Sequence, residues 1–244
     1  MTQSQSDHGR EPGEAAQAPT VLALETSTAA CSVALAVRGA IRADHRIVPR
    51  EHNRLILPMV DALLRSAGVD RRELDAVAFG RGPGSFTGVR IAAGIAQGIS
   101  LGLSIPVVPV SSLEALAQAA FAAYPDAHHV LATIRSRPDE TYVAGYRLDA
   151  DRCRVLAPES VAGSTQHRLP ECVDSTWWAV GDGVAHFAEG LAALGCAVDA
   201  TLLPTATGVL TLAVRALASG KTVGAADALP VYLQGTRPWR KLAD

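Results

Sequence analysis

The sequence of 244 residues lacks a surplus of basic residues. Its 22 lysines and arginines are outnumbered by 24 acidic residues, and the formal net charge is -2 at pH 7. A protein that grips RNA or DNA by itself usually carries a basic surplus, because neutralised phosphates supply most of its non-specific affinity. The composition therefore argues against tight nucleic-acid binding by the isolated chain.

Cysteine motifs and long apolar runs are also lacking. The four cysteines are widely scattered and form no C-x-x-C pair, which argues against a zinc ribbon or a dithiol redox site and indicates a reducing compartment. No segment offers about 18 uninterrupted apolar residues, the length that spans a membrane. Residues 1–19 are polar and have no apolar core of a signal peptide, so we interpret them as a disordered tail. We expect a cytoplasmic protein that does not contact a membrane.

Recognisable metal or catalytic motifs are the third absence. The seven histidines form neither H-x-x-x-H nor H-E-x-x-H, and the adjacent His128 and His129 would face opposite sides of a strand. A triad whose members are distant in sequence is not excluded, but no motif supports one. The sequence therefore predicts no metal site and no catalytic residue.

The sequence does contain 48% hydrophobic residues, enough for a substantial core. The elements predicted in the first half are three strands within 21–48, a helix over 51–68, a strand over 74–80, a helix to about Leu101 and a strand over 105–110. Pro58 lies inside the first of these helices, so we expect either a kink there or a later helix start.

The second half repeats this arrangement. Its predicted elements are a helix over 114–124, three strands within 129–161, a strand at 177–180, a helix over 185–195 and a final helix over 208–220 that returns to the first half. Three strands, helix, strand, helix, occurring twice, predicts an internal structural repeat. Two such α/β lobes describe the duplicated ribonuclease-H-like fold of the actin/hexokinase type (ASKHA). We assign 20–109 plus 207–244 to the first lobe and 110–206 to the second.

In this architecture a nucleotide would lie in the cleft between the lobes, at the carboxyl ends of the strands. Glu25 and Glu114 are the two carboxylates expected near that cleft. Glu25 either takes part in chemistry or caps the hydroxyl-rich turn that follows it, and a lone carboxylate is weak evidence for catalysis.

The stretch GRGPGSFTGVR, residues 80–90, joins a predicted strand to a predicted helix. Its glycines allow positive φ and close approach to a ligand, Ser85 or Thr87 can cap the helix, and the free N–H groups there attract anions. The stretch matches neither the dinucleotide fingerprint, nor the P-loop, nor the G-x-S-x-G elbow. Arg90 points into solvent or meets an anion, either a phosphate or a partner's carboxylate. The candidate anion-contact residues are Gly80, Gly82, Gly84, Ser85, Thr87, Gly88 and Arg90.

The helix behind this loop carries Gly94, Gly98 and Gly102 at four-residue spacing. Each glycine costs about 1 kcal/mol relative to alanine in a helix, so we infer that something packs closely against them. That is either the protein's own sheet or a helix of another chain. Together with the apolar stripe of the helix over 51–68, this helix forms a candidate protein–protein interface. The candidate interface residues are Leu55, Ile56, Met59, Leu63, Ile91, Gly94, Ile95 and Gly98.

Five stretches are similar to one known family. They are LALETSTAACSVAL, EHNRLILPMVDALL, GRGPGSFTGVRIAAGIAQG, IPVVPVSSLEALA and the terminal PVYLQGTRPWRKL. They resemble the bacterial tRNA threonylcarbamoyladenosine biosynthesis family TsaB (YeaZ-like, with a Gcp-like domain). The similarity runs from about residue 21 to the C-terminus and is loose between 150 and 215. The sequence departs from the family at Glu25, where Asp is more common, and at Arg135–Arg137, where an Asp-Ala-Arg run is common.

The resemblance implies a non-catalytic partner that scaffolds and activates the TsaD transferase. TsaD-like proteins carry a metal-binding histidine pair at positions that match Ser112 and Leu116 here, so the metal site is expected to be missing. The family reaction attaches threonylcarbamoyl, from its adenylate, to the adenosine beside the anticodon of tRNAs that read codons beginning with A. The family's dimer contacts imply an interface on the two helices, at roughly 53–66 and 87–101.

The partners implied by the resemblance are TsaD in a direct heterodimer, the TsaE ATPase, and tRNA only through the complex. A second copy of the chain is a further partner when the chain is alone. No cofactor is expected apart from ATP or ADP at the partner interface. Two other functions stay open: an active ATP-dependent kinase or ATPase of the same superfold, and a peptidase, which no nucleophile–base pair supports.

Overall fold

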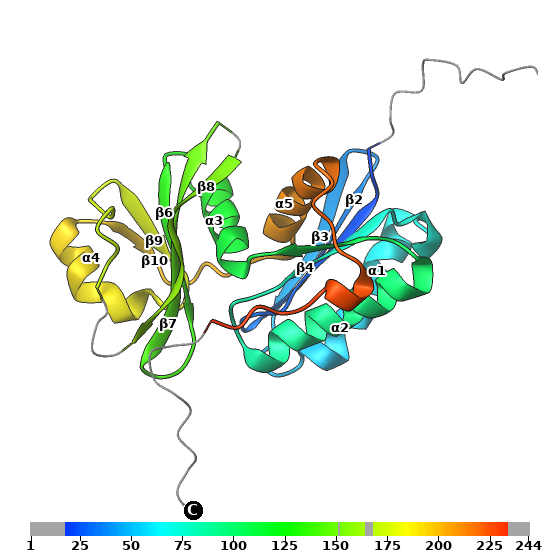
Figure 1. Cartoon of the computed structure of the whole chain (residues 1–244), viewed down its shortest axis with the longest axis horizontal. Coiled ribbons are helices and arrows are strands. Elements are labelled where there is room, and N and C mark those ends of the chain that lie inside the picture. Colours follow the sequence, from blue (N-terminus) through cyan, green and yellow to red (C-terminus); the bar gives the residue numbers. More distant parts are fainter. Residues whose placement is uncertain (1–17, 151, 164–167, 234–244) are drawn as a thin grey trace, which may run out of the picture.

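The computed structural model describes residues 18–150, 152–163 and 168–233, and contains two five-stranded sheets (Figure 1). The strands of the first sheet are β1 (Val21–Glu25), β2 (Ala30–Val37), β3 (Ala40–Ile47), β4 (Ala76–Gly80) and β5 (Val107–Val110). One face of this sheet is covered by α1 (His52–Ala67) and α2 (Phe86–Leu103), and the other by α5 (Ala206–Ala218). The predicted return of the final helix to the first half is confirmed.

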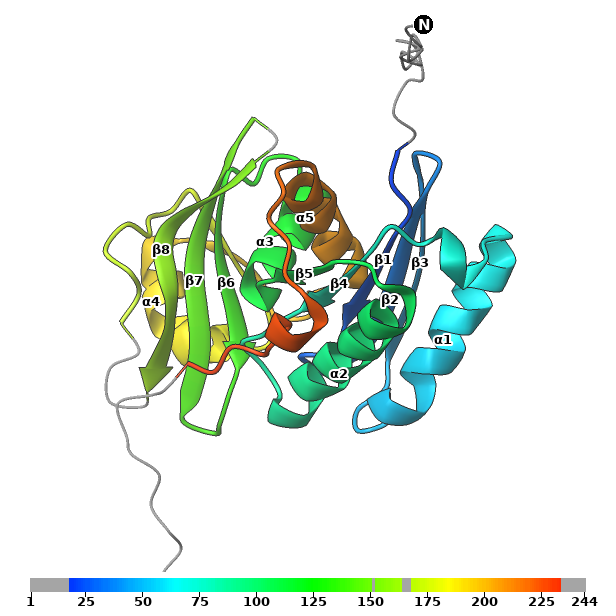
Figure 2. The same ribbon diagram turned by 45° about the vertical axis from the view of Figure 1, so that its right-hand side comes forward.

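The second sheet lies in the C-terminal half. Its strands are β6 (His129–Arg135), β7 (Glu140–Asp149), β8 (Arg152–Gly163), β9 (Trp177–Val180) and β10 (Ala197–Asp199). The helix α3 (Ser112–Ala123) covers one face, and α4 (Ala188–Leu194) with a short 3-10 helix (Val184–Phe187) covers the other. In Figure 2, α3 and α5 lie between the two sheets, while α1 and α2 lie on the far side of the first.

The two sheets have the same topology. Their orders are β3-β2-β1-β4-β5 and β8-β7-β6-β9-β10, with three antiparallel strands followed by two parallel additions in each. This duplication confirms the predicted two-lobe ASKHA-type fold. The repeat is less complete than predicted, because the described residues 168–176 between β8 and β9 form turns rather than a helix. The exact lobe limits stay a prediction.

The central strands are apolar because both of their faces are covered. Every residue of β1 and β4 is buried, and alternate side chains enter two different cores. Leu22 and Leu24 face α1 and α2, whereas Val21 and Ala23 face α5. The edge strand β3 is exposed and charged instead, which discourages pairing with another sheet.

Helix ends follow the sequence signals. Gly68 ends α1 in the left-handed conformation at φ 65°. Ser85 is the N-cap of α2 and its hydroxyl accepts from the Gly88 N–H, whereas Thr87 lies inside the helix. α1 begins at His52 and runs through Pro58 without interruption, so the alternative of a later start is wrong.

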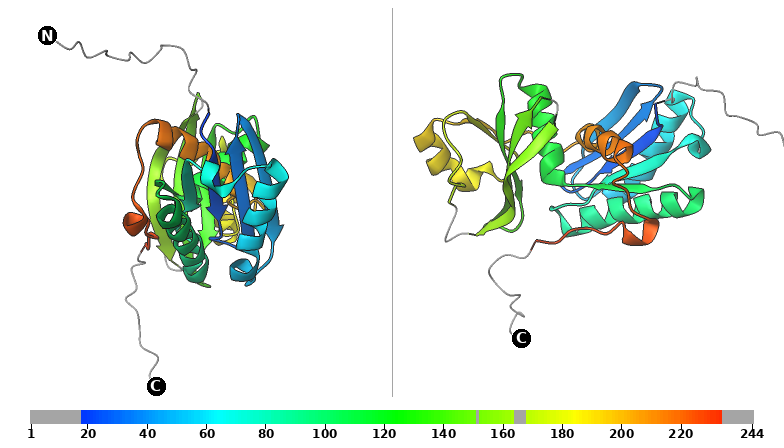
Figure 3. Two further views of the ribbon diagram at one scale, coloured as in Figure 1. Left: turned by 90° about the vertical axis from the view of Figure 1, so that its right-hand side faces the viewer. Right: turned by 45° about the horizontal axis from the view of Figure 1, so that its top comes forward.

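The C-terminal segment that follows α5 also packs on the first lobe. Val223 pairs with Val107 beside β5, a 3-10 helix (Ala225–Asp227) follows, and Gln97 of α2 donates to the Ala228 carbonyl (Figure 3). The segment is thereby fixed along α2 up to residue 233. Most of the predicted tail at 1–19, and the terminal stretch from 234 onward, lie outside the described residues.

α2 is the one helix among the described residues that is long and apolar enough to cross a membrane by length and composition, with a mean hydropathy of 1.2 over 18 residues. It packs against the first sheet through Ala92, Ala93 and Ala96, and carries Arg90 in its second turn. A single helix of this kind carries little weight, and the cytoplasmic location stays a prediction.

Candidate functional site

The glycine loop packs against its own chain. The Ser85 N–H donates to the Ser27 carbonyl at 2.7 Å, and the Thr26 hydroxyl donates to the Gly88 carbonyl at 2.8 Å. A Cβ added at Gly84 would lie 2.5 Å from the Ser27 carbonyl oxygen, and one added at Gly88 would overlap the Thr26 carbonyl. Because Gly84 and Gly88 have no side chain, the turn between β1 and β2 can pack against the loop. The space above these glycines therefore holds this turn rather than a phosphate.

Glu25 is sealed beneath this loop. Its side chain is completely buried, Oε1 accepts from the Ser27 N–H at 2.6 Å, and Oε2 accepts from the Ser112 hydroxyl at 2.9 Å. Any side chain at Gly80 would overlap its carboxyl group. Burial raises the pKa of Glu25 above its usual value. Of the two interpretations of Glu25, the structure supports the turn cap.

The second candidate carboxylate, Glu114, lines a pocket between the lobes. The pocket has a volume of about 500 Å³, and Lys221 also lines it. The pKa of Glu114 is raised by burial and by Glu159, which pairs with Arg81 at 3.1 Å. This pocket is lined by Arg81 of the first lobe and by Arg152 and Cys153 of the second, whereas Glu25 is completely buried beneath the glycine loop.

The positions that match the TsaD histidines hold other chemistry. Ser112 donates to Glu25, and Leu116 is buried in the core between α3 and the second sheet. No group of three or more His, Cys, Asp or Glu side chains with metal-binding spacing occurs within the described ranges. A hydroxyl–imidazole contact does exist between Thr141 and His186, but Thr141 is completely buried and the other ring nitrogen of His186 faces the Pro138 carbonyl.

Arg90 has an environment that the sequence did not predict. Its Nε donates to the Tyr232 hydroxyl at 2.8 Å, and its guanidinium carbon lies 3.5 Å from the ring centre of Phe86. Tyr232 comes from the C-terminal segment, 142 positions further along the chain. Arg90 is exposed, as the solvent interpretation expects, and two aromatic rings contact its guanidinium group.

A polar cleft of about 870 Å³ separates the lobes near the start of α2. Arg50 lines it from the first lobe, and Arg135 and Asp182 line it from the second. Neither Arg50 nor Arg135 has an ion-pair partner within the described part of the chain. Sequence analysis missed Arg50 and Asp182, because only the packing of the two lobes brings these distant residues together.

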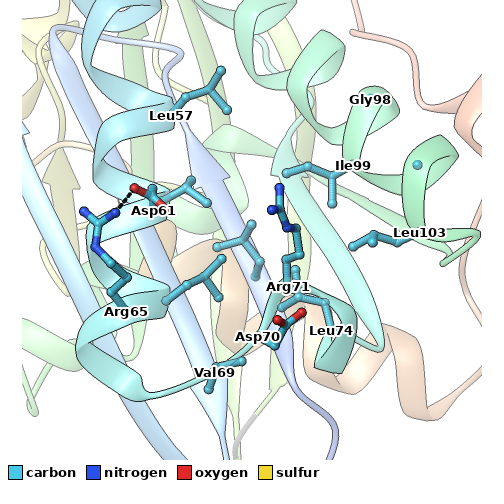
Figure 4. Close-up of a pocket in the computed structure, with 14 residues that line it drawn as sticks. Leu57, Asp61, Arg65, Val69, Asp70, Arg71, Leu74, Gly98, Ile99 and Leu103 are labelled. Atoms are coloured by element: carbon cyan, nitrogen blue, oxygen red, sulfur yellow. Dashed lines mark hydrogen bonds and ion pairs between the residues drawn. The ribbon is translucent and has the colours of Figure 1, made fainter.

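A second hollow, the α1–α2 groove, has a volume of about 640 Å³ (Figure 4). Leu57, Asp61 and Arg65 of α1 form one side, and Gly98, Ile99 and Leu103 of α2 form the other. Arg71 extends into the gap between the helices. Apolar side chains line most of the groove, and Asp61, Arg65, Asp70 and Arg71 add charged groups to it.

The glycines beside this groove are uncovered. Among the described residues, a Cβ added at Gly94, Gly98 or Gly102 would meet no atom within 4 Å apart from the helix itself and its neighbours in the chain. The protein's own sheet therefore does not explain them, because the sheet contacts the opposite, alanine-rich side of α2. Packing against the protein's own sheet is therefore the wrong explanation, and packing against another chain stays a prediction.

The predicted interface residues divide into two groups. Ile56, Met59 and Leu63 are buried in the core of the first lobe, so these three stabilise the lobe and do not present a surface. Their place in the predicted interface is corrected for that reason. Leu55, Ile91 and Ile95 are half-buried, and Gly94 and Gly98 are exposed. Leu57 was not among the predicted interface residues. It is 53% exposed and lies on α1 outside the buried side of the helix.

Comparisons with known proteins show to which family the chain is related. The family model described as TsaD, tRNA N6-adenosine threonylcarbamoyltransferase, matches residues 45–212. The tRNA threonylcarbamoyladenosine biosynthesis protein TsaB of Escherichia coli K12 is 40% identical over 231 residues, which cover 91% of this chain and 97% of that protein. The chain belongs to the TsaB family. The resemblance found in the sequence is thereby confirmed.

Two further matches relate this TsaB-family chain to a solved structure and to a transferase. The structure of YeaZ from Pseudomonas aeruginosa superimposes with a TM-score of 0.80 at 43% identity, covering 88% of this chain and 100% of YeaZ. A tRNA N6-adenosine threonylcarbamoyltransferase of Nitratidesulfovibrio vulgaris DP4 is 51% identical over 69 residues, or 28% of this chain and 19% of that protein. This pairwise match covers one section of each chain, whereas the family model of the transferase matches residues 45–212.

Proposed function

We propose that this TsaB-family chain takes part in tRNA threonylcarbamoyladenosine formation as the non-catalytic partner of a TsaD-type transferase, which it scaffolds and activates. The observation that carries the proposal is the uncovered glycine ridge of α2, defined by Gly94, Gly98 and Gly102, beside the α1–α2 groove.

The ridge supports a helix-packing role for a physical reason. Each glycine costs about 1 kcal/mol of helix stability relative to alanine, and no described residue of this chain occupies the space. A helix of another chain can approach a ridge without side chains more closely than it can approach alanine or leucine. The half-buried Ile91 and Ile95 and the exposed Leu57 supply apolar area around it.

The loop and the carboxylate support the non-catalytic part of the proposal. Glu25 is enclosed by Ser27, Gly80 and Ser112, so its carboxyl group cannot coordinate a metal or activate a water without opening the loop. The resemblance aligns Ser112 and Leu116 with the metal-binding histidines of TsaD-like proteins, and neither residue has an imidazole. On this account the chemistry belongs to the partner.

The partners follow from the same account. The TsaD-type subunit binds directly at the α1–α2 groove, ATP or ADP binds at the interface thus formed, and a TsaE-type ATPase and tRNA join the assembled complex. When the partner is missing, the same groove pairs with a second copy of the chain, because an uncovered apolar ridge favours self-association.

Size-exclusion chromatography with light scattering tests the interface. The chain is mixed with the TsaD-type transferase from the same cell, and we expect a complex with the mass of both subunits. Gly98→Leu should weaken this complex by at least about tenfold, because a leucine side chain would fill the space for the partner helix. Ile95→Asp should do the same by placing a charge in an apolar interface.

The matched control is Ala193→Leu on α4, which adds the same side chain to an exposed helix of the second lobe. It should leave the complex unchanged. Should Gly98→Leu and Ile95→Asp both co-elute with the transferase as the wild type does, the groove is not the interface.

A further inference from the structure

Two exposed aromatic rings stand at the start of α2. The side chains of Phe86 and Tyr232 are 61% and 48% exposed, and their ring centres lie 5.8 Å apart. Only 5% of the residues in the whole chain are aromatic, so two large exposed rings in contact are a local concentration. Exposed apolar side chains that gather in one place mark an interaction site more often than scattered ones do.

Arg90 fixes the orientation of these rings. Its guanidinium lies 3.5 Å from the ring centre of Phe86 and 5.4 Å from that of Tyr232, while its Nε donates to the Tyr232 hydroxyl. The guanidinium therefore covers one face of Phe86. Because Phe86 also lines the interlobe cleft, the exposed part of its ring forms a pre-oriented flat surface at the rim of that cleft.

The same cleft carries two cations on opposite walls. Arg50 precedes α1 in the first lobe and Arg135 ends β6 in the second, and both side chains are exposed without an ion-pair partner within the described ranges. Among the described residues, Asp182 is the one acidic side chain that lines the cleft, and its Oδ1 already accepts from the Arg135 N–H at 2.8 Å. The cleft therefore has a local positive charge in a chain whose net charge is -2.

We propose that the rim formed by Phe86, Arg90 and Tyr232, together with Arg50 and Arg135, binds a single-stranded segment of RNA. A nucleic-acid base stacks on an aromatic face, whereas phosphates pair with arginines. A strand that enters the cleft places one base on Phe86 and its neighbouring phosphates between Arg50 and Arg135. The inference rests on the proposed function, because it gives the chain its own contact with the tRNA of the complex.

Such a contact is consistent with the composition. Two arginines and one stacking surface provide too little electrostatic attraction for tight binding by a chain of net charge -2. Within a complex, the transferase holds the tRNA and this rim adds a second, local contact. An acidic peptide would use the two arginines but not the flat face of Phe86, and therefore fits the cleft less well.

The test measures tRNA affinity of the assembled complex by fluorescence anisotropy, with an unmodified, labelled tRNA transcript that reads a codon beginning with A. The double variant Arg50→Glu/Arg135→Glu should bind at least about tenfold more weakly. The slope of log affinity against log salt should fall by about 1.4, since each phosphate contact to a single strand contributes about 0.7. Arg38→Glu/Arg42→Glu, on the exposed hairpin of β2 and β3, is the matched control and should behave as wild type.

A second set of variants isolates stacking. Phe86→Leu keeps an apolar side chain against Arg90 but removes the flat ring, and should cost about tenfold in affinity. Phe86→Trp keeps the flat ring and should bind within about twofold of the wild type. Equal losses in Phe86→Leu and Phe86→Trp would mean that Phe86 only packs against Arg90, and would overturn the stacking assignment.

The outcomes separate this inference from the proposed function. If the complex forms and all variants bind tRNA with wild-type affinity and salt slope, the RNA site is wrong and the scaffold role stands. If no complex forms, the scaffold role fails. The RNA site is then tested by cross-linking the same tRNA to the isolated chain at low salt, and the variants should rank by cross-linking yield as they do by affinity. A third outcome would show a site for free nucleotide instead. In that case Mg-ATP at millimolar concentration binds the isolated chain, this binding depends on Arg50 and Arg135, and the nucleotide displaces tRNA.

Discussion

At the scale of single residues, Glu25 decides how the loop above it is interpreted. A carboxylate at the end of the first strand predicts chemistry when it faces a cleft, and a turn cap when it faces its own backbone. One carboxylate oxygen of Glu25 accepts from the Ser27 N–H and the other from the Ser112 hydroxyl. The carboxyl group lies so close to Gly80 that any side chain there would overlap it. The residue therefore stabilises the glycine loop, and this role has a measurable pH dependence.

Glu25→Gln should remove part of the pH dependence of stability. The native state holds the Glu25 proton more tightly than the unfolded chain does, because burial raises its pKa above the usual 4.5. Its contribution is thus complete below about pH 4.5 and is lost as the pH rises toward the native pKa. Urea unfolding across this range should show the free energy of unfolding falling more steeply with pH in the wild type than in Glu25→Gln. Glu171→Gln, at an exposed turn, is the control, and parallel curves for all three proteins would contradict the assignment.

The cysteines provide a second test at this scale. Burial raises the pKa of Cys31 to about 11 and that of Cys153 to about 12, so only about one thiol in a thousand or fewer is ionised there at pH 8. Cys172 is exposed. A thiol reagent followed by peptide mass spectrometry should label Cys172 first and Cys31 last, since Cys31 is completely buried as well. Labelling of Cys31 before Cys172 in the native protein would disprove the packing of β2.

At the scale of elements, α2 has three different sides. Alanines face the sheet, the side with Phe86, Arg90 and Gln97 holds the C-terminal segment, and the glycine ridge is uncovered. The sequence predicted the helix, offered Ser85 or Thr87 as its N-cap and singled out its glycines. It could not assign the sides, because the apolar pattern of α2 is broad and small residues occur on more than one of them.

Two glycine-to-alanine changes should therefore have opposite effects on stability. Gly88→Ala should lower the free energy of unfolding by about 1–3 kcal/mol, because its Cβ would overlap the Thr26 carbonyl. Gly98→Ala should raise it by about 0.5–1 kcal/mol, because alanine favours the helix and meets no atom within 4 Å. Urea denaturation of the isolated chain, at a concentration where it is monomeric, measures both. A destabilised Gly98→Ala would mean that the ridge is packed within the chain.

At the scale of the whole molecule, the duplication was accessible from the sequence because strand and helix periodicities recur in the same order. The details that were not predicted depend on how separate segments meet. The second lobe has no helix in residues 168–176 to match α1, and β10 is only three residues long. Likewise, Arg50 and Arg135 share a cleft only after the lobes have packed.

The same limit applies to the candidate site. Apolar residues in the helix over 51–68 were predicted to face a partner, but Ile56, Met59 and Leu63 face the first sheet. Periodicity identifies a buried side of a helix without saying whether the chain's own core or another protein covers it. The glycine ridge was more informative, because small residues cost helix stability and need an explanation wherever they lie.

The most direct test of the central claim is reconstitution of threonylcarbamoyladenosine on a tRNA transcript, measured by mass spectrometry of its nucleosides. Purified TsaD-type transferase, TsaE-type ATPase and threonylcarbamoyl adenylate are combined with the wild-type chain, with Gly98→Leu or with Glu25→Gln. We predict that the chain alone forms no product, that wild type and Glu25→Gln restore modification by the transferase, and that Gly98→Leu does not. Product formed by the chain without the transferase, or loss of activity in a folded Glu25→Gln that still binds the transferase, would contradict a non-catalytic scaffold.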